Sequence, residues 1–475
     1  MDRAGNREER RYGWSDWLVL ILMHLLVWGY MVQILVRPDD GWAFYFAAIS
    51  MLFMVFALIR ERSWFWFISV AFLSVGMMVL WIKRIPFADV WHYFGSTTNV
   101  VTLLILAPLF SIPITLGAYH RSALLIVRGK VRKPHSVFFV LTAFTYLLAT
   151  LMNAAAIVAA YTTLHHLSRS FPKTIAEKMN DAAYCRGHVL AMIWSPVGAG
   201  LGVALSRVPA DPTTVIVLGV GFSIFMLVFD TWMMKGWIRR HTDVEAHPMT
   251  HFEDHHISKT HWRRMGVFCG FIVVFVIGVI GCHEWFAMSV IDAVILLILL
   301  ISLSWALVLK QPKRLRQELK AKWTSGMLGF VPQMMLFTSV GFFTKVMTVS
   351  GVMDSLVQVV ARWSGSFGWL LIFLIVAIAV FSAQLGLFPA LIVILLADLI
   401  PYEAMHLRPE WFVFAITAGA VGGVPASPLT VNVSLVANLM QKDPIKISRS
   451  NYPFAISILV FVSLITIGLS LLFPV

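Results

Sequence analysis

Two Ser-Pro pairs, each set among glycines inside an apolar stretch, are the residues of this chain best suited to bind a charged solute. Ser195-Pro196 is followed by Gly198 and Gly200, and Ser427-Pro428 is preceded by glycines at 422 and 423. Proline removes a backbone donor and glycine tolerates non-helical angles, so each stretch predicts a helix break. We expect each serine to be the N-cap of a restarted half-helix with proline at its first position. The free N–H groups and dipole of such a helix start favour an anion.

Polar side chains accompany each break at matching distances. Asn153 precedes Ser195 by nearly the same stretch of chain as Gln384 precedes Ser427. A side-chain amide offers both donors and acceptors. Serine and threonine in membrane helices often bond their own backbone, and asparagine and glutamine often join helices, so direct contact with a substrate is one of two readings. The predicted substrate-binding set is Asn153, Ser195, Pro196, Gly198, Ser382, Gln384, Ser427, Pro428, Thr430 and Asn432.

The elements that would position these residues are membrane-spanning helices. Hydrophobic residues make up 59% of the 475 residues and charged residues 13%. The apolar residues come in runs of about 20, the length of a bilayer span, and backbone groups in lipid must be satisfied within the segment. One such run covers 100–118. We therefore predict an all-α polytopic membrane protein with about eleven transmembrane helices.

Two apolar runs have a length that fits neither one span nor two. They cover 136–166 and 369–400, about 31 residues each, and basic loops flank the first on both sides. We interpret each as a re-entrant hairpin with Asn153 or Gln384 at its tip; a single steeply tilted helix is the alternative. The hairpins are followed by the broken helices, at 183–205 and 411–440.

The same order of hairpin and broken helix occurs twice. The offset from the first tip to the second nearly equals the offset from the first Ser-Pro pair to the second. The first hairpin enters from the cytoplasmic side and the second from the outside, so we predict two inverted-topology repeats with a midplane site. The predicted division is an N-terminal three-helix extension (1–97), transport repeat 1 (98–235), a His-rich loop with two joining helices and a basic loop (236–325), and transport repeat 2 (326–473).

The net charge of +13 is explained by membrane topology. With a cytoplasmic N-terminus, 30 of the 37 Lys and Arg residues fall on the inner side, including those at 169–186. This positive-inside asymmetry requires no nucleic acid partner. We expect a multi-pass protein of the cell membrane with its C-terminus outside. The N-terminal run is followed by no cleavage site, so an uncleaved anchor is expected, and the three cysteines suggest neither a disulfide framework nor a metal site.

The pattern resembles the ion transporter superfamily, which includes divalent anion/sodium symporters and citrate and arsenite-type permeases. The resemblance covers 98–235 and 326–473, and it implies that tips and breaks together form the substrate and coupling-ion sites. The dicarboxylate branch carries Ser-Asn-Thr at both tips. The tips here read Met152-Asn153-Ala154 and Ser382-Ala383-Gln384, so the resemblance implies the architecture and leaves substrate and coupling ion open.

The favoured function is alternating-access secondary transport of a small anionic solute, coupled to Na⁺ or H⁺ and needing no other cofactor. Asp230, Asp292 and Asp398 lie in or at the ends of apolar runs, where carboxylates often act as relays, but none belongs to the tips and breaks. This shortage of midplane charge favours an anion over a cation. Membrane lipid is the expected surrounding, and a homodimer is compatible with the extra helices.

Three other functions fit parts of the sequence. A translocase for lipids or lipid-linked phosphates would use the same half-helix dipoles, and the 18 Trp and 35 Phe would suit a lateral opening. A membrane di-iron enzyme is a remote alternative, because the loop 241–261 holds one histidine box, His251-x-x-x-His255-His256, where about three are needed. A channel is disfavoured, because no selectivity sequence or ring of carboxylates is evident.

Overall fold

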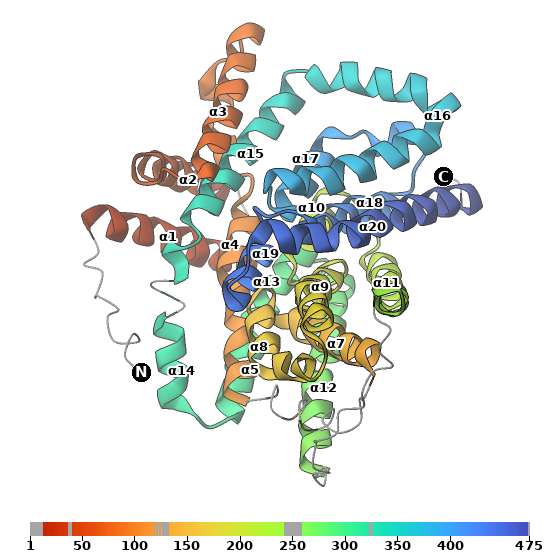
Figure 1. Ribbon diagram of the computed structural model, residues 1–475. Helices are drawn as coiled ribbons and strands as arrows, with labels where there is room; N and C mark the ends of the chain where they lie inside the picture. Colours follow the sequence, from red (N-terminus) through yellow and green to blue (C-terminus); the bar gives the residue numbers. More distant parts are fainter. Residues whose placement is uncertain are drawn as a thin grey trace. The chain divides into compact units, whose positions relative to one another are not determined.

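The computed structural model shows an all-α membrane protein (Figure 1). It describes residues 13–36, 40–117, 119, 122, 125, 133–241, 259–321, 323 and 326–473. Within these ranges there is no β-strand, and ten helical segments are long and apolar enough to cross a membrane. Two shorter apolar segments, at 290–306 and 389–399, add to them. The predicted fold class is thus confirmed.

The chain divides into two compact units, of which the first comprises Met1–Ile105 and Arg316–Val352. Its main helices are α1 (Trp14–Leu35), α2 (Asp40–Arg60), α3 (Trp64–Lys83) and α15 (Val331–Val349). Helix α15 packs against α3, α2 and the short helix η2 (Trp91–Gly95). Phe342 of α15 stacks on Phe94 with ring centroids 4.4 Å apart, and Thr97 donates a hydrogen bond to the Phe337 carbonyl at 3.1 Å. Aromatic packing therefore fixes α15 within this unit.

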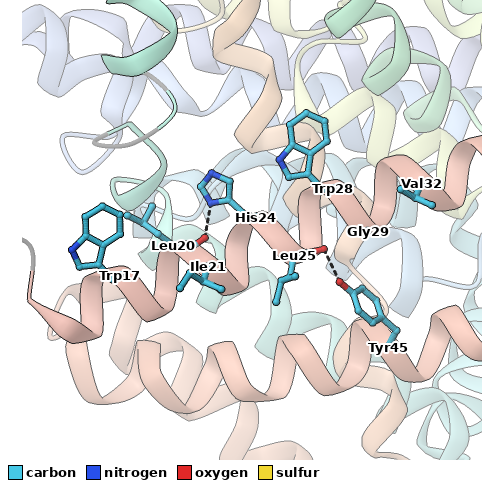
Figure 2. A pocket seen from close by; sticks show the side chains of 9 residues that line it. All are labelled: Trp17, Leu20, Ile21, His24, Leu25, Trp28, Gly29, Val32 and Tyr45. Atoms are coloured by element: carbon cyan, nitrogen blue, oxygen red, sulfur yellow. Dashed lines mark hydrogen bonds between the residues drawn. The ribbon is translucent and has the colours of Figure 1, made fainter.

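Helices α1 and α2 of this unit form an open apolar groove, shown in Figure 2. Its two most polar side chains are tied to helix carbonyls. His24 Nδ1 lies 2.6 Å from the Leu20 oxygen, and the Tyr45 hydroxyl donates to the Leu25 oxygen at 3.0 Å. Since those polar atoms are already satisfied, the groove presents an apolar wall suited to lipid chains.

The second unit comprises Leu106–Leu315 and Met353–Val475. It contains two series of helices that follow one another in a similar order. The first series is α7 (Pro134–Met152), α8 (Ala155–Leu164), η4 (His165–Ser170), α9 (Lys173–Met192), α10 (Ala199–Arg207) and α11 (Pro212–His241). The second is α16 (Val352–Ser382), η6 (Ala383–Leu385), α17 (Pro389–Leu399), α18 (Pro409–Gly422), η8 (Val424–Ala426), α19 (Val431–Met440) and α20 (Pro444–Leu472). Helices α12 (Lys259–Phe286) and α13 (Val290–Val308) lie between the two series in the chain.

The contacts between the two series come in exchanged pairs. Helix α10 packs against α17 while α19 packs against α8, and α11 packs against α18 while α20 packs against α9. The pair α10–α18 likewise has its counterpart in α19–α9. A two-fold axis produces this exchange, because element i of one half meets element j of the other and the reverse. The packing supports the inverted repeats predicted from the offsets.

Both helix breaks have the same local structure. Ser195 and Ser427 are each followed by two turn residues, and the helices resume at Ala199 and Val431. The prediction that the serines are N-caps is therefore wrong. The N-caps are Gly198 and Thr430, because each proline lies in the turn after the serine and the helix starts later.

Each predicted hairpin is two helical arms joined by a turn at the expected tip. In the first, α7 and α8 are joined at Asn153, which has φ 50° and ψ −136°. In the second, α16 leads through η6 to Gly386 at φ 74° before α17 begins. The second tip is thus longer, and its first arm begins at Val352 rather than at 369. Whether the hairpins are re-entrant in a bilayer stays a prediction.

The run expected as one helix over 100–118 is interrupted. Helix α4 (Thr98–Leu106) is followed by the 3₁₀ segment η3 (Ala107–Phe110) and by α5 (Ser111–Gly117). Pro108 lies within the 3₁₀ segment, where its missing N–H breaks the α-helical ladder. The histidine box at 251–256 lies outside the described residues.

Candidate functional site

The two break serines make the same pair of hydrogen bonds. Ser195 Oγ donates to the Thr150 carbonyl at 2.7 Å and accepts from the Val197 N–H at 3.3 Å. Ser427 Oγ donates to the Gln384 carbonyl at 3.4 Å and accepts from the Leu429 N–H at 3.3 Å. Each serine therefore ties its break to the tip region of its own hairpin.

The other predicted residues of the second half gather around its break. Gln384 Nε2 donates to the Gly423 carbonyl at 3.3 Å. Thr430 Oγ1 donates to the carbonyls of Val424 at 2.9 Å and Ser427 at 3.0 Å. Ser382, the last residue of α16, is half-buried. The tip and break of this half are thus one hydrogen-bonded unit.

The prolines and glycines shape the breaks rather than present polar atoms. Pro196 is buried and Pro428 half-buried, each in the turn after its serine. A Cβ on Gly198 would lie 3.1 Å from the Ser195 oxygen. A Cβ on Gly423 would lie 2.1 Å from the Val380 carbonyl oxygen. The close approach of α16 to the second break therefore requires glycine at 423.

His188 connects the first tip to the second half, although no pattern in the sequence pointed to it. Its Nε2 lies 3.0 Å from Asn153 Oδ1, and its Nδ1 lies 2.9 Å from Asn432 Nδ2. Asn432 Nδ2 also donates to the Cys185 carbonyl at 3.2 Å. These residues come from α9, the tip after α7, and α19, so this network joins the two repeats where their discontinuities meet. Asn153 and Asn432 are brought together through a histidine.

A buried ion pair lies on the same helix as His188. Arg186 of α9 pairs with Asp230 of α11 at 2.5 Å, and the two side chains are 3% and 0% exposed. Arg186 also donates to Asn451 Oδ1 at 2.8 Å and to the Ser450 carbonyl at 2.9 Å, both in α20. The charge asymmetry predicted a cytoplasmic loop position for Arg186, whereas the structure buries it as the partner of Asp230. The signal available in the sequence was Asp230, because a carboxylate inside an apolar run needs a partner of opposite charge.

The other intramembrane acids lie apart from this network. Asp398 pairs with Arg207 at 3.5 Å, joining α17 to α10. Asp292 bonds the Ser289 hydroxyl at 2.6 Å at the start of α13. Within the described residues there is no group of three or more His, Cys, Asp or Glu side chains that would hold a metal ion.

Comparison with known proteins identifies the fold. No family model and no curated protein matches the chain. Among solved structures, the YdaH transporter of Alcanivorax borkumensis, described as having an unusual topology, matches with a TM-score of 0.59 and 13% identity, over 86% of this chain and 99% of that one. MtrF of Neisseria gonorrhoeae, from a class of antimetabolite efflux pumps, matches with a TM-score of 0.53 and 11% identity, over 78% of this chain and 82% of that one. The chain therefore shares the fold of these membrane transporters.

Proposed function

We propose that this protein is a secondary active transporter that moves an anionic solute across the cell membrane by alternating access. The observation that carries the proposal is the exchanged packing of two hairpins and two broken helices, with polar side chains at the discontinuities. Inverted repeats with broken helices place substrate at the midplane of known transporters. The shared fold with two transporters supports the same reading.

The chemistry of the breaks favours an anion. Helices α10 and α19 begin at Ala199 and Val431, and the first N–H groups of a helix lack partners within it. These donors and the helix dipole together attract negative charge. The Leu429 side chain beside the second break is 61% exposed, so this break is not covered by other parts of the described chain. Asp230, on the neighbouring helix α11, is neutralised by Arg186.

The remaining parts of the proposal concern surroundings and coupling. We place the N-terminus in the cytoplasm and the C-terminus outside, on the positive-inside asymmetry. The hairpins are re-entrant in this arrangement, and the transported anion is driven by a Na⁺ or H⁺ gradient. A homodimer stays a prediction from the sequence. The more specific assignment to the ion transporter superfamily is likewise part of the proposal.

The test is a thermal-unfolding screen of the purified protein against carboxylates, phosphates, sulfonates and soluble lipid headgroups. A ligand present at about 100 times its dissociation constant stabilises by about 2.7 kcal/mol. We expect a hit that is weakened in Ser195→Ala and Ser427→Ala. Ser470→Ala is the matched control, because Ser470 bonds the Ile467 carbonyl of its own helix at 2.8 Å.

A lipid-linked phosphate is the second candidate substrate, favoured by the apolar groove between α1 and α2 (Figure 2). Stabilisation by lipid headgroups alone would select it over a soluble anion. No hit in any class, or a hit of equal size in wild type and both serine variants, would refute the anion site at the breaks.

A further inference from the structure

The hydrogen-bond polarity of the His188 network is determined by one backbone carbonyl. The Cys185 oxygen only accepts, so the Asn432 nitrogen, 3.2 Å away, must be the donor. The same nitrogen lies 2.9 Å from His188 Nδ1, which must then accept. A neutral imidazole with an accepting Nδ1 carries its proton on Nε2, and that proton points at Asn153 Oδ1, 3.0 Å away. The network as built therefore requires a neutral His188.

A proton added to this histidine has one place to go. It would enter at Nδ1 and face the donor nitrogen of Asn432. The acceptor of the same amide, Asn432 Oδ1, is buried and has no hydrogen-bond partner. Rotating the amide would bring that oxygen to Nδ1 and turn its nitrogen away from the Cys185 carbonyl. Protonation thus exchanges one contact between α9 and α19 for another.

The surroundings of the imidazole contain no competing charge in bonding contact. Its hydrogen-bond partners in the described part of the chain are the two asparagine amides. Helix α19 and segment η8 carry no titratable side chain. The other titratable side chains on α9 and the elements packed against it, none of which bonds to His188, are His135, Tyr146, Tyr161, His165, His166, Arg169, Lys173, Glu177, Lys178, Asp181, Tyr184, Cys185, Arg186, Asp230, Lys235, Arg239, Arg240, His241, Glu410, Lys446, Arg449 and Tyr452.

We propose that the coupling ion of this transporter is a proton and that His188 carries it. Histidine changes its charge in the physiological pH range, and an ionisable residue within a membrane domain commonly serves a proton pathway. His188 contacts the first tip and the second broken helix. Gain or loss of its proton therefore changes the stability of the contact between the two repeats. The proton comes from water on the side to which the site is open, and returns to water on the other. This inference rests on the proposed transport function.

The first test needs no substrate. Thermal unfolding of purified protein is measured from about pH 8 to about pH 5 for the wild type and His188→Gln. The unfolded chain protonates this histidine freely below about pH 6.5, whereas the network holds His188 neutral in the folded state. The unfolded state then binds more protons, so the wild type should lose stability as the pH falls, and His188→Gln should lose less. His24→Gln is the matched control, because His24 bonds a carbonyl of its own helix; it should follow the wild type. Parallel profiles for wild type and His188→Gln would overturn the proposal.

A charge placed beside the imidazole sharpens this test. Asn432→Asp puts a carboxylate 2.9 Å from Nδ1 in place of the donor. An opposite charge at this distance raises the proton affinity of a histidine by about tenfold or more. The acid sensitivity of the wild type should therefore disappear or reverse. If this variant does not fold, Asn153→Asp makes the same comparison at Nε2. A pH profile unchanged by the carboxylate would overturn the proposal.

The second test uses proteoliposomes that enclose a pH-sensitive dye, with anions found in the ligand screen as probes. A proton gradient should drive anion uptake together with protons in the wild type. In His188→Gln the number of protons taken up per anion, read from the dye, should fall by about tenfold. Uptake driven by sodium and retained in His188→Gln would refute proton coupling. If no probe is bound or moved by the wild type, the transport proposal fails, while the unfolding profiles still show whether protonation of His188 is linked to the stability of the fold.

Discussion

The ion pair of Arg186 and Asp230 offers a prediction whose size follows from its burial. The two side chains are 3% and 0% exposed and lie 2.5 Å apart. Arg186 has further bonds to Asn451 and to the Ser450 carbonyl, so its charge is held by α11 and α20 together. Removing the carboxylate leaves a buried cation without its counter-charge.

Asp230→Asn should therefore destabilise the protein by about 3–5 kcal/mol, the usual cost of breaking a buried pair. Replacing both members, Arg186→Met with Asp230→Leu, removes the unpaired charge and should be much less destabilising than either change alone. The matched control is the exposed pair of Lys173 and Glu177, 3.9 Å apart, with the lysine 91% exposed. Lys173→Ala should change the stability by about 0.5 kcal/mol or less.

The assay is a double-mutant cycle of the wild type, Arg186→Met, Asp230→Leu and the variant with both changes, measured by unfolding in detergent at one pH and salt concentration. Contacting residues in such a network show coupling energies of about 0.5–3 kcal/mol, and full burial places this pair at the upper end. Strictly additive single effects, or a cost for Asp230→Asn no larger than that of Lys173→Ala, would refute the reasoning. Either result would mean that water reaches the pair.

Further predictions concern the breaks and the helix end beyond them. Ser195→Ala and Ser427→Ala should each lower the free energy of unfolding by about 1 kcal/mol. The loss should be larger for Ser195, because its donated hydrogen bond is 2.7 Å long and that of Ser427 is 3.4 Å. The reverse order would contradict the geometry. Gly423→Ala should cost about 1–3 kcal/mol by overpacking against the Val380 carbonyl, whereas Gly468→Ala, with nothing within 4 Å, should be neutral or slightly stabilising in the same unfolding assay. Burial, and secondarily the charge of Arg186, lowers the pKa of Lys178 from 10.5 to about 8. Because the folded state disfavours the charged amine, the free energy of unfolding should rise as the pH increases from about 8 to about 10.5, and Lys178→Met should abolish that rise; a rise of equal size in the variant would assign it to other groups.

The breaks and tips were predictable because their signals are local. Proline with glycine in an apolar run, and a run too long for one span, are features of a few neighbouring residues. The nearly equal offsets then related the two halves. The position of the helix restart was missed by about one helical turn, since whether a serine caps the helix depends on the turn that its proline adopts.

The polar networks were not predictable, because their members are far apart in the chain and follow no period. His188 and Asn432 are 244 residues apart, and Arg186 and Asn451 are 265 apart. Helix α9 has a mixed polar and apolar composition. From the sequence alone, its first part was therefore interpreted as a cytoplasmic loop. Only the packing of α19 and α20 against α9 shows that this helix is the centre of the second unit.

The two-fold relation of the repeats also shows what is not repeated. At the offset that relates Ser195 to Ser427, the counterpart of His188 is Ala420, and that of Asn432 is Gly200. Helix α10 packs against α18 as α19 packs against α9, yet Gly200 lies beside the Thr417 methyl group and no polar pair forms there. In alternating access by inverted repeats, the two halves exchange conformations, and equal contacts would give two states of equal energy. Under the transport mechanism we propose, a histidine network on one of the two equivalent contacts makes the two states chemically different, so the protonation state of a single side chain decides which state is favoured.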